Sequence, residues 1–174
     1  WEGMGHGGRQ SVGLVAQATE GVRRMADGLR PAALEDLGLP AAIRWYSERL
    51  ASSRGLSVEV EISGLQTRLS AQTELGLYRV VQEALVNVAK HSGAHNARVI
   101  LEQQNGTVRV LIEDDGRGFN GKEASWGRGL GLFGLRERVA LLGGSLHIDT
   151  QVRQGTRGFA KIAIDNRGGR EGEE

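Results

Sequence analysis

The amino-acid sequence predicts an α+β fold, in which a mixed sheet carries its helices on one face. Helical patterns occupy the first half of the 174-residue chain, whereas strand patterns dominate the second half. The segments RVILEQQ and TVRVLIED flank Asn105-Gly106, a dipeptide that favours the type I′ turn of a hairpin. No internal repeat is present in the sequence. Helices followed by strands are typical of a two-layer α/β sandwich.

The composition excludes several classes of protein. A net charge of +1, from 22 basic and 21 acidic residues, gives no electrostatic argument for nucleic-acid binding. The chain has no cysteine, so disulfides and thiolate metal sites are excluded. No apolar run approaches the ~20 residues of a membrane-spanning helix. Glycine is the outlier, with 27 residues, and glycines clustered inside a fold indicate backbone that approaches a ligand.

The N-terminal part predicts a leader and then a helix. Residues 1–10 are Gly-rich, and the chain begins at Trp1, so we expect a flexible leader and a fragment of a longer protein. In residues 11–30 apolar side chains recur at spacings of four, four, three and four: Leu14, Ala18, Val22, Met25 and Leu29. This narrow seam suits another helix, either in the same domain or across a dimer. Pro31 ends the helix.

Residues 32–165 are expected to form one domain. Residues 32–53 predict a single helix, and alternation over Leu56–Ile62 predicts a strand. Ser70 is the expected N-cap of the following helix. After the hairpin come a polar segment, a helix over residues 130–142 and two strands, GSLHIDTQ and RGFAKIAI. The charged, Gly-rich tail, residues 166–174, is expected to be disordered.

The helix YRVVQEALVNVAKHS, residues 78–92, is apolar almost all the way round, which is typical of a buried helix. One stripe of it is polar, at steps of four, four and three: Arg79, Glu83, Asn87 and Lys90. Residues at these spacings share one helical face. A stripe of this kind on its own is more often a solvated surface.

The segment EDDGRGF, residues 113–119, follows an apolar strand face. Period two places four residues on one side of that strand: Val108, Val110, Ile112 and Asp114. Asp114 therefore lies at the rim of the core, where its carboxylate needs a donor from the protein or from a ligand. Gly116 and Gly118 follow, where a neighbour approaches the backbone closely. A tight turn capped by Asp114 and a binding site explain the motif equally well.

The segment GRGLGLFGLRERV, residues 127–139, brings glycines into the start of a helix. Such a backbone presents N–H groups and a positive dipole end to a phosphate. Gly129–Gly134 also spells GxGxxG, with Asp149 placed 20 residues after Gly129, which invites a dinucleotide-binding interpretation. That fingerprint requires a strand directly before the glycines, and NGKEASWGR stands there instead. The single motif is weak.

The order of the motifs is more specific than any one of them. ExxxN (Glu83, Asn87) is followed by DxGxG (Asp114, Gly116, Gly118), then GxGL (Gly129, Gly131), then Gly155-Thr156. This series resembles the N, G1, G2 and G3 boxes of sensor histidine kinases. Their nucleotide-binding domain belongs with those of gyrase and the large heat-shock chaperones, the Bergerat fold. The nitrate-sensor and DesK-like subgroup is resembled at Leu29-Arg30-Pro31, Leu37-Gly38-Leu39, Lys90-His91-Ser92 and Gly134-Leu135-Arg136-Glu137-Arg138.

The resemblance implies that the polar stripe faces ATP and Mg²⁺. Asn87 is expected to coordinate Mg²⁺, and Glu83 to orient or deprotonate in the transfer step. Lys90 provides a compact positive charge near a phosphate. His91 is expected either to hydrogen-bond nearby or to be structural. Phosphate contacts through backbone N–H groups are expected from Gly129, Leu130, Gly131 and Leu132.

The resemblance also implies an adenine pocket. Asp114 is expected to accept a hydrogen bond from the adenine 6-amino group, and Gly116 and Gly118 to let the base lie close. Thr156 is expected to support this pocket beside Asp114, and residues 120–128 to form an ATP lid.

The function implied is that of the ATP-binding catalytic domain of a sensor histidine kinase. The γ-phosphoryl group passes to a histidine and then to a response regulator. This chain lacks the acceptor, since its four histidines precede Gly7, Ser92, Asn96 and Ile148 rather than an acidic residue in a helix. Residues 11–31 resemble a remnant of the dimerisation helix, so the expected partners are a response regulator and the phosphoacceptor helix of the same or a second kinase chain. No contact with nucleic acid or membrane is expected, and the location is cytoplasmic.

Two alternatives stay open. One is an anti-sigma-factor-like serine kinase of the same fold, against which the Leu29-Arg30-Pro31 segment argues. The other is a non-catalytic nucleotide-binding module that regulates a partner. Glu83 favours catalysis, because nucleotide binding alone does not require an acid at that position.

Overall fold

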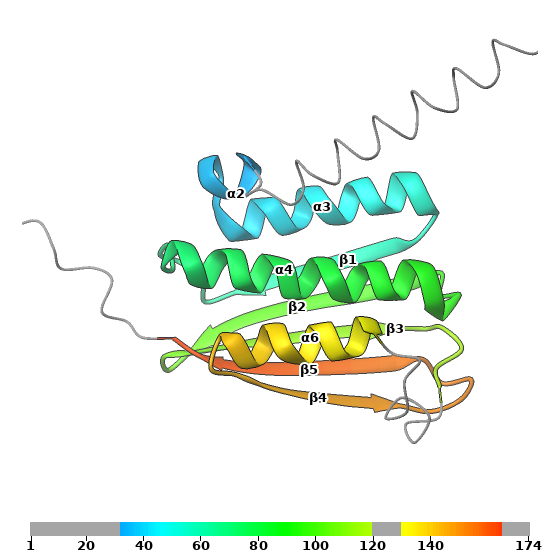
Figure 1. The fold of residues 1–174 in the computed structure, drawn as a ribbon. Helices are drawn as coiled ribbons and strands as arrows, with labels where there is room; N and C mark the ends of the chain where they lie inside the picture. Colours follow the sequence, from blue (N-terminus) through cyan, green and yellow to red (C-terminus); the bar gives the residue numbers. More distant parts are fainter. Residues whose placement is uncertain (1–31, 120–129, 165–174) are drawn as a thin grey trace, which may run out of the picture.

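A computed structural model describes residues 32–119 and 130–164, and it arranges them as a sheet with helices on one of its faces (Figure 1). The expected leader, seam helix and tail lie outside the described residues. The helices are α2 (Ala32–Asp36), α3 (Gly38–Arg54), α4 (Ala71–Asn87), the π-helix η1 (Val88–Ser92) and α6 (Leu130–Leu141). The strands are β1 (Ser57–Ser63), β2 (Asn96–Gln104), β3 (Thr107–Asp114), β4 (Ser145–Thr150) and β5 (Thr156–Ala163).

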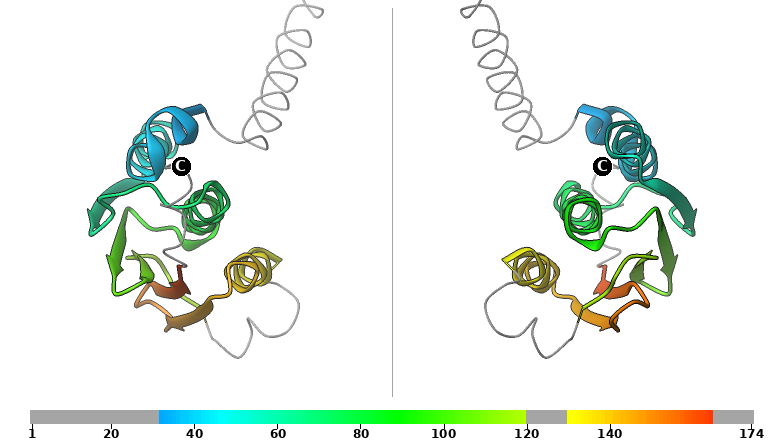
Figure 2. Two further views of the ribbon diagram at one scale, coloured as in Figure 1. Left: turned by 90° about the vertical axis from the view of Figure 1, so that its left-hand side faces the viewer. Right: turned by 90° about the vertical axis from the view of Figure 1, so that its right-hand side faces the viewer.

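The sheet has the order β1-β2-β3-β5-β4. Strand β1 runs parallel to β2, and the other three pairs are antiparallel, so the prediction of a mixed sheet is confirmed. Figure 2 shows the sheet curving around α3, α4 and α6, which all lie on its concave side. The core fills the space between these two layers, and its strand residues include Val99, Leu101, Val108, Val110 and Ile162.

Local signals predicted two junctions correctly. Asn105 and Gly106 have φ values of 50° and 70°, as the type I′ turn between β2 and β3 requires. Ser70 caps α4, since its Oγ accepts a hydrogen bond of 3.2 Å from the backbone N–H of Thr73. Both signals lie within a few residues of the structure that they specify.

The prediction of a single helix over residues 32–53 is wrong, because α2 ends at Asp36 and α3 begins at Gly38. Gly38 has a φ of +84°, which side-chain-bearing residues rarely adopt. A Cβ atom at Gly38 would lie 3.4 Å from the side chain of Arg68. Arg68 also donates a 3.0 Å hydrogen bond to the carbonyl of Leu34 in α2. The chain therefore turns between α2 and α3 where it packs against the side chain of Arg68, which is distant in the sequence.

The polar stripe of the long helix is regular only as far as Asn87. There α4 ends and the π-helix η1 begins, which widens the turn and alters which side chains share a face. Lys90 is exposed in η1, and Gly93 ends it in the left-handed conformation with a φ of 66°. The prediction of a continuous α-helical stripe from Arg79 to Lys90 is wrong at its last step, because residues after Asn87 leave the α-helical period.

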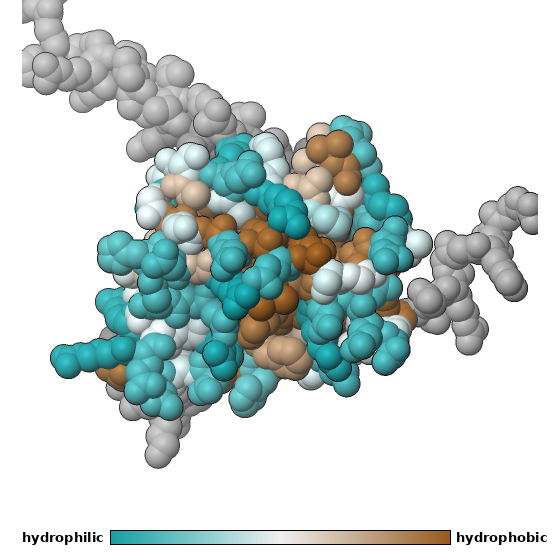
Figure 3. All heavy atoms as spheres, turned by 180° about the vertical axis from the view of Figure 1, so that it is seen from behind, coloured by the Kyte–Doolittle hydropathy of each residue, from teal (hydrophilic) through white to brown (hydrophobic). Residues whose placement is uncertain are grey.

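The convex face of the sheet carries no helix in the described part of the chain. Figure 3 shows an apolar band at the centre of this face. Ile100, Leu111 and Phe159 are cross-strand neighbours and alternate along their strands with buried core residues, which places them on this face. Charged side chains border this band. No helix among the described residues is long and apolar enough to cross a membrane.

Candidate functional site

A cavity of about 410 Å³ lies between the helices and the end of the sheet where β3 finishes and β5 starts. Its apolar lining comes from α4, three strands and α6: Val80, Ala84, Ile112, Leu135, Leu146 and Ala160. Its polar lining includes Asn87, His91, Asp114, Arg117 and Thr156. An apolar cavity of this size with a few convergent polar groups is typical of a small-molecule site.

Asp114 ends β3 and lies half-buried at the wall of this cavity. Burial raises the pKa of its carboxyl group, while hydrogen bonds from the Gly116 N–H and the Thr156 hydroxyl act in the opposite direction. The bond from Gly116 to Oδ1 measures 2.9 Å. Asp114 thus caps a turn, as one alternative expected, and it also lines the cavity, so the binding-site alternative stays a prediction.

The two glycines after Asp114 are required by neighbouring protein atoms. A Cβ atom at Gly116 would lie 2.6 Å from both Cβ and the carbonyl oxygen of Ser92. Gly118 has a φ of +55°, and its Cβ atom would lie 2.0 Å from the carbonyl oxygen of Gln151. Gly118 also lines the cavity. The expectation that both glycines lie against a base stays a prediction.

The end of α4 supplies the polar edge of the cavity. Asn87 lines it, and its Nδ2 atom is buried without a hydrogen-bond partner among the described residues. A buried amide nitrogen of this kind is unusual, because buried polar groups are normally hydrogen-bonded. His91 also lines the cavity, whereas Lys90 and the half-buried Glu83 do not belong to the lining.

The start of α6 closes the cavity on the other side. Leu132 lines the cavity in the first turn of α6, which begins with Leu130 and Gly131. The first N–H groups of a helix have no partner within the helix, so they are available to an anion. Gly129 and the expected lid, residues 120–128, lie outside the described residues.

Sequence reasoning missed residues that hold the loops around the cavity. Asp115 accepts hydrogen bonds from the backbone N–H groups of His95 and Asn96, both at 2.9 Å. Thr150 Oγ1 accepts a 3.1 Å hydrogen bond from the N–H of Phe119 and lies 3.4 Å from the Thr156 hydroxyl. No periodicity or motif distinguishes Asp115 or Thr150, since each acts on a distant segment.

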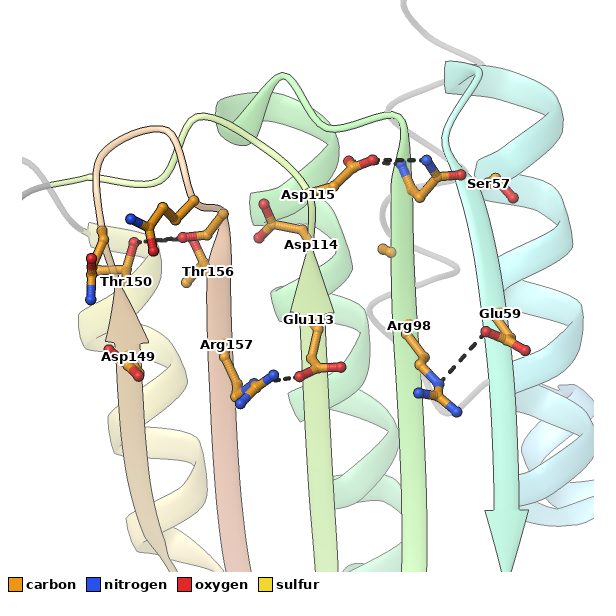
Figure 4. A pocket seen from close by; sticks show the side chains of 15 residues that line it. Ser57, Glu59, Arg98, Glu113, Asp114, Asp115, Asp149, Thr150, Thr156 and Arg157 are labelled. Carbon is orange, nitrogen blue, oxygen red and sulfur yellow. Dashed lines mark hydrogen bonds and ion pairs between the residues drawn. The ribbon is translucent and has the colours of Figure 1, made fainter.

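A larger and shallower hollow of about 800 Å³ lies on the convex face of the sheet (Figure 4). Its side chains form ion pairs across the strands, Arg98 with Glu59 at 3.6 Å and Arg157 with Glu113. These charges are largely satisfied by one another. The enclosed apolar cavity therefore offers the better ligand site, and Asp114 borders both spaces.

The side chains that could ligate a metal limit which ion suits the cavity. The described residues contain no group of three His, Cys, Asp or Glu side chains that could hold a metal ion. Mg²⁺ usually takes one or two protein ligands and completes its shell with phosphate oxygens and water. One amide at the cavity edge, Asn87, fits a Mg²⁺ ion that arrives with a phosphate ligand, and it does not fit a metal held by protein ligands alone.

Comparison with known proteins gives one consistent result. Residues 72–166 match the family model described as histidine kinase-, DNA gyrase B-, and HSP90-like ATPase. The oxygen sensor histidine kinase NreB of Staphylococcus carnosus is 35% identical over 144 residues, which cover 83% of this chain and 42% of NreB. The sensor histidine kinase MctS of Rhizobium johnstonii is 40% identical over 143 residues, which cover 81% of this chain and 31% of MctS.

A solved structure agrees in fold. The histidine kinase domain of the Erythrobacter litoralis EL346 blue-light activated histidine kinase superposes with a TM-score of 0.59 at 24% identity, covering 72% of this chain and 61% of that domain. The present chain spans less than half the length of NreB and of MctS.

Proposed function

Since this chain belongs to the family of histidine kinase-, DNA gyrase B- and HSP90-like ATPases, we propose that it is the ATP-binding catalytic domain of a two-component sensor histidine kinase. It transfers the γ-phosphoryl group of ATP to a histidine outside this chain. A response regulator then receives the group. The likeness to two sensor kinases over more than four-fifths of this chain supports this choice within the family.

The observation that carries the proposal is the Asp114 carboxylate in the wall of a predominantly apolar cavity. The flat faces of a purine fit an apolar cavity, and its exocyclic amino group donates a hydrogen bond. Asp114 forms no ion pair with a cation among residues 32–119 and 130–164, and a half-buried carboxylate of this kind is a strong acceptor for such a donor. Adenine presents such an amino group at its 6-position, and because guanine has one at its 2-position, the choice of adenine follows the ATPase family rather than Asp114 alone.

The phosphates of the nucleotide are assigned to the opposite end of the cavity. Asn87 lines the cavity at the end of α4, and the first N–H groups of α6 are donors available to an anion there. Bound Mg²⁺ supplies neutralisation of the phosphate charge, with Asn87 as its protein ligand. His91 lines the cavity as a hydrogen-bonding group, and the exposed Lys90 beside it in η1 is assigned to the phosphates as a positive charge.

Glu83 is assigned to the transfer step. It lies four residues before Asn87 on α4, half-buried and outside the cavity lining, so it does not contact the base. From this place its carboxylate orients the acceptor imidazole or takes its proton as the phosphoryl group arrives. The expected partners are therefore a phosphoacceptor helix and a response regulator, and a cytoplasmic location belongs to the same proposal.

Titration calorimetry of the chain with ATP and with NAD, each with Mg²⁺, tests the binding part of the proposal. We expect ATP to bind and NAD not to bind, and binding of NAD alone would support the GxGxxG interpretation instead. Addition of an acceptor domain with radiolabelled ATP then tests transfer. An acid-labile phosphoprotein indicates phosphohistidine, an acid-stable one indicates the serine-kinase alternative, and no transfer indicates a non-catalytic module.

A further inference from the structure

The turn between β4 and β5, residues 151–155, clamps the loop that follows Asp114. The N–H of Arg153 donates a 2.6 Å hydrogen bond to the carbonyl of Arg117. Gly118 packs so closely under the turn that a Cβ atom there would lie 2.0 Å from the carbonyl of Gln151. Both Arg117 and Gly118 line the cavity. The position of the cavity wall therefore depends on this turn.

Thr150 connects the β4–β5 turn to the carboxylate of Asp114 through Thr156. Figure 4 shows Thr150, Thr156 and Asp114 side by side at the ends of β4, β5 and β3. Asp114 and Thr156 are direct cross-strand neighbours in β3 and β5, and hydrogen bonding by the Thr156 hydroxyl opposes the rise in the pKa of Asp114 that burial causes. Thr150 Oγ1 lies 3.4 Å from Thr156 Oγ1 and donates a 3.1 Å hydrogen bond to the carbonyl of Gly155.

Either hydroxyl can donate in the contact between Thr150 and Thr156, and donation from Thr156 to Asp114 selects one of the two directions. A threonine hydroxyl has one proton to donate and two lone pairs. Because Thr156 gives its proton to Asp114, it only accepts on the side of Thr150. Thr150 in turn accepts from the N–H of Phe119 at 3.1 Å and directs its own proton towards Gly155 and Thr156. Removal of the Thr150 hydroxyl thus leaves the Phe119 N–H without its acceptor and frees the Thr156 hydroxyl to rotate.

We propose that Thr150 is a positioning residue for the nucleotide base, acting through Thr156 on Asp114 and through Phe119 on the cavity wall. This role rests on the proposed function, since it presumes that a base occupies the cavity. Thr150 itself is not part of the cavity lining, so it does not touch the ligand. A purely structural threonine would affect stability and leave ligand affinity unchanged.

The test compares Thr150→Val with Thr150→Ser in the full 174-residue chain. Valine fills the same space without the hydroxyl, and serine keeps the hydroxyl without the methyl group. Thr107→Val, at the opposite end of the sheet, is the matched control for replacing a strand hydroxyl with a methyl group. Calorimetry with ADP and with ATP, at a temperature well below every melting point, gives the dissociation constants.

We expect Thr150→Val to raise the Kd by about three- to tenfold, which corresponds to the loss of one hydrogen bond. The factor is the same for ADP and ATP, because the phosphate end of the cavity is not altered. Thr150→Ser and Thr107→Val keep the wild-type Kd within about twofold, the resolution we set for the comparison. In the transfer assay Thr150→Val raises KM for ATP and leaves kcat unchanged.

Two results overturn the inference while the proposed function stands. One is a wild-type Kd for Thr150→Val in a series where Asp114→Ala loses binding. The other is an equal rise in the Kd of Thr150→Ser, which would assign the loss of affinity to the missing methyl group rather than to the hydroxyl. Failure of the wild-type chain to bind either nucleotide would instead overturn the proposed function and the role of Thr150 with it.

Discussion

The carboxylate of Asp115 holds Asn96 by both of its nitrogen atoms, accepting hydrogen bonds of 2.9 Å from the backbone N–H and 2.7 Å from the side-chain amide. These bonds join the start of β2 to the loop after β3. The N–H of Arg117 adds a bond of 2.8 Å to the carbonyl of Ser92, at the end of η1. The two polar ends of the cavity, at Asn87 and at Asp114, are therefore set relative to each other by this tether.

Asp115→Ala should slow phosphoryl transfer more than it weakens nucleotide binding. A displacement of about 1 Å between reacting groups can reduce a rate by about 10²-fold, whereas the base pocket itself keeps its contacts. Asp115→Asn should restore the rate, because its Oδ1 accepts both backbone N–H groups and Asn96 can turn its amide to accept from the new Nδ2. Single-turnover rates and calorimetric Kd values measure the two effects, and an unchanged rate in Asp115→Ala would contradict the tether.

Asp114→Ala and Glu83→Ala should separate binding from transfer. We expect Asp114→Ala to abolish ATP binding, since the base loses its acceptor in an apolar wall. We expect Glu83→Ala to bind ATP with an affinity near that of the wild type and to lose transfer by about 10²–10⁴-fold, the usual contribution of an acid–base group. Calorimetry and the radiolabel assay measure both, and an Asp114→Ala variant with wild-type affinity rules out the pocket assignment.

Asp114→Asn should become more stable relative to the wild type as the pH rises from about 4 to 7. The pKa of Asp114 is raised by burial, so its favourable contribution is present below the unfolded pKa of about 3.9 and is lost as the pH rises through the folded pKa. Asparagine avoids the cost of the half-buried charge. Urea unfolding at several pH values measures this, and a difference that is independent of pH would exclude it.

The pH dependence of stability is reversed at Asp115, because hydrogen bonds from Asn96 lower the pKa of its carboxyl group. Its favourable contribution is present above the unfolded pKa and is lost as the pH falls through the folded pKa. Asp115→Asn serves as the control for the Asp114 experiment, since its stability relative to the wild type should improve on acidification.

Gly118→Ala should destabilise the domain more than Gly143→Ala. Both positions have positive φ values, +55° and +66°, so alanine costs about 1–2 kcal/mol of strain at either one. At Gly143 no atom lies within 4 Å of the new Cβ, whereas at Gly118 the carbonyl of Gln151 lies at 2.0 Å. Denaturant unfolding measures the difference. Equal losses of unfolding free energy in the two variants would show that the β4–β5 turn moves away from the new Cβ atom without destabilising the domain.

Arg68→Ala should destabilise the domain more than Arg98→Ala. Arg68 holds the buried Glu74 carboxylate with two hydrogen bonds of 2.8 Å, and its removal leaves that buried charge with the 3.3 Å hydrogen bond from the Leu69 N–H and no cation. Arg98 pairs with Glu61 on the exposed face, where ion pairs contribute little. Thermal unfolding ranks the two variants. Adding Glu74→Gln to Arg68→Ala should recover part of the loss, and no recovery would assign the loss to other contacts of Arg68.

Sequence periodicity predicted those parts of the fold that depend on near neighbours. The face formed by Val108, Val110 and Ile112 is buried, with exposed fractions of 0%, 1% and 8%, and Asp114 ends it at the rim as expected. Asn87, His91, Asp114, Leu132 and Thr156 all line one cavity. Their types and order in the chain were sufficient to nominate them, because each belongs to a short motif whose chemistry is local.

The sequence by itself determined the layers, the hairpin, the helix start at Ser70 and several residues that line the cavity, among them Asn87, Asp114 and Thr156. Only the tertiary structure decided where the first helix breaks, where the α-helical stripe ends, and which residues hold the site together. Arg68 against Gly38, Asp115 against Asn96 and Thr150 against Phe119 each join segments far apart in the chain. Propensity and periodicity act over a few residues, whereas these contacts exist only after the sheet and helices have packed.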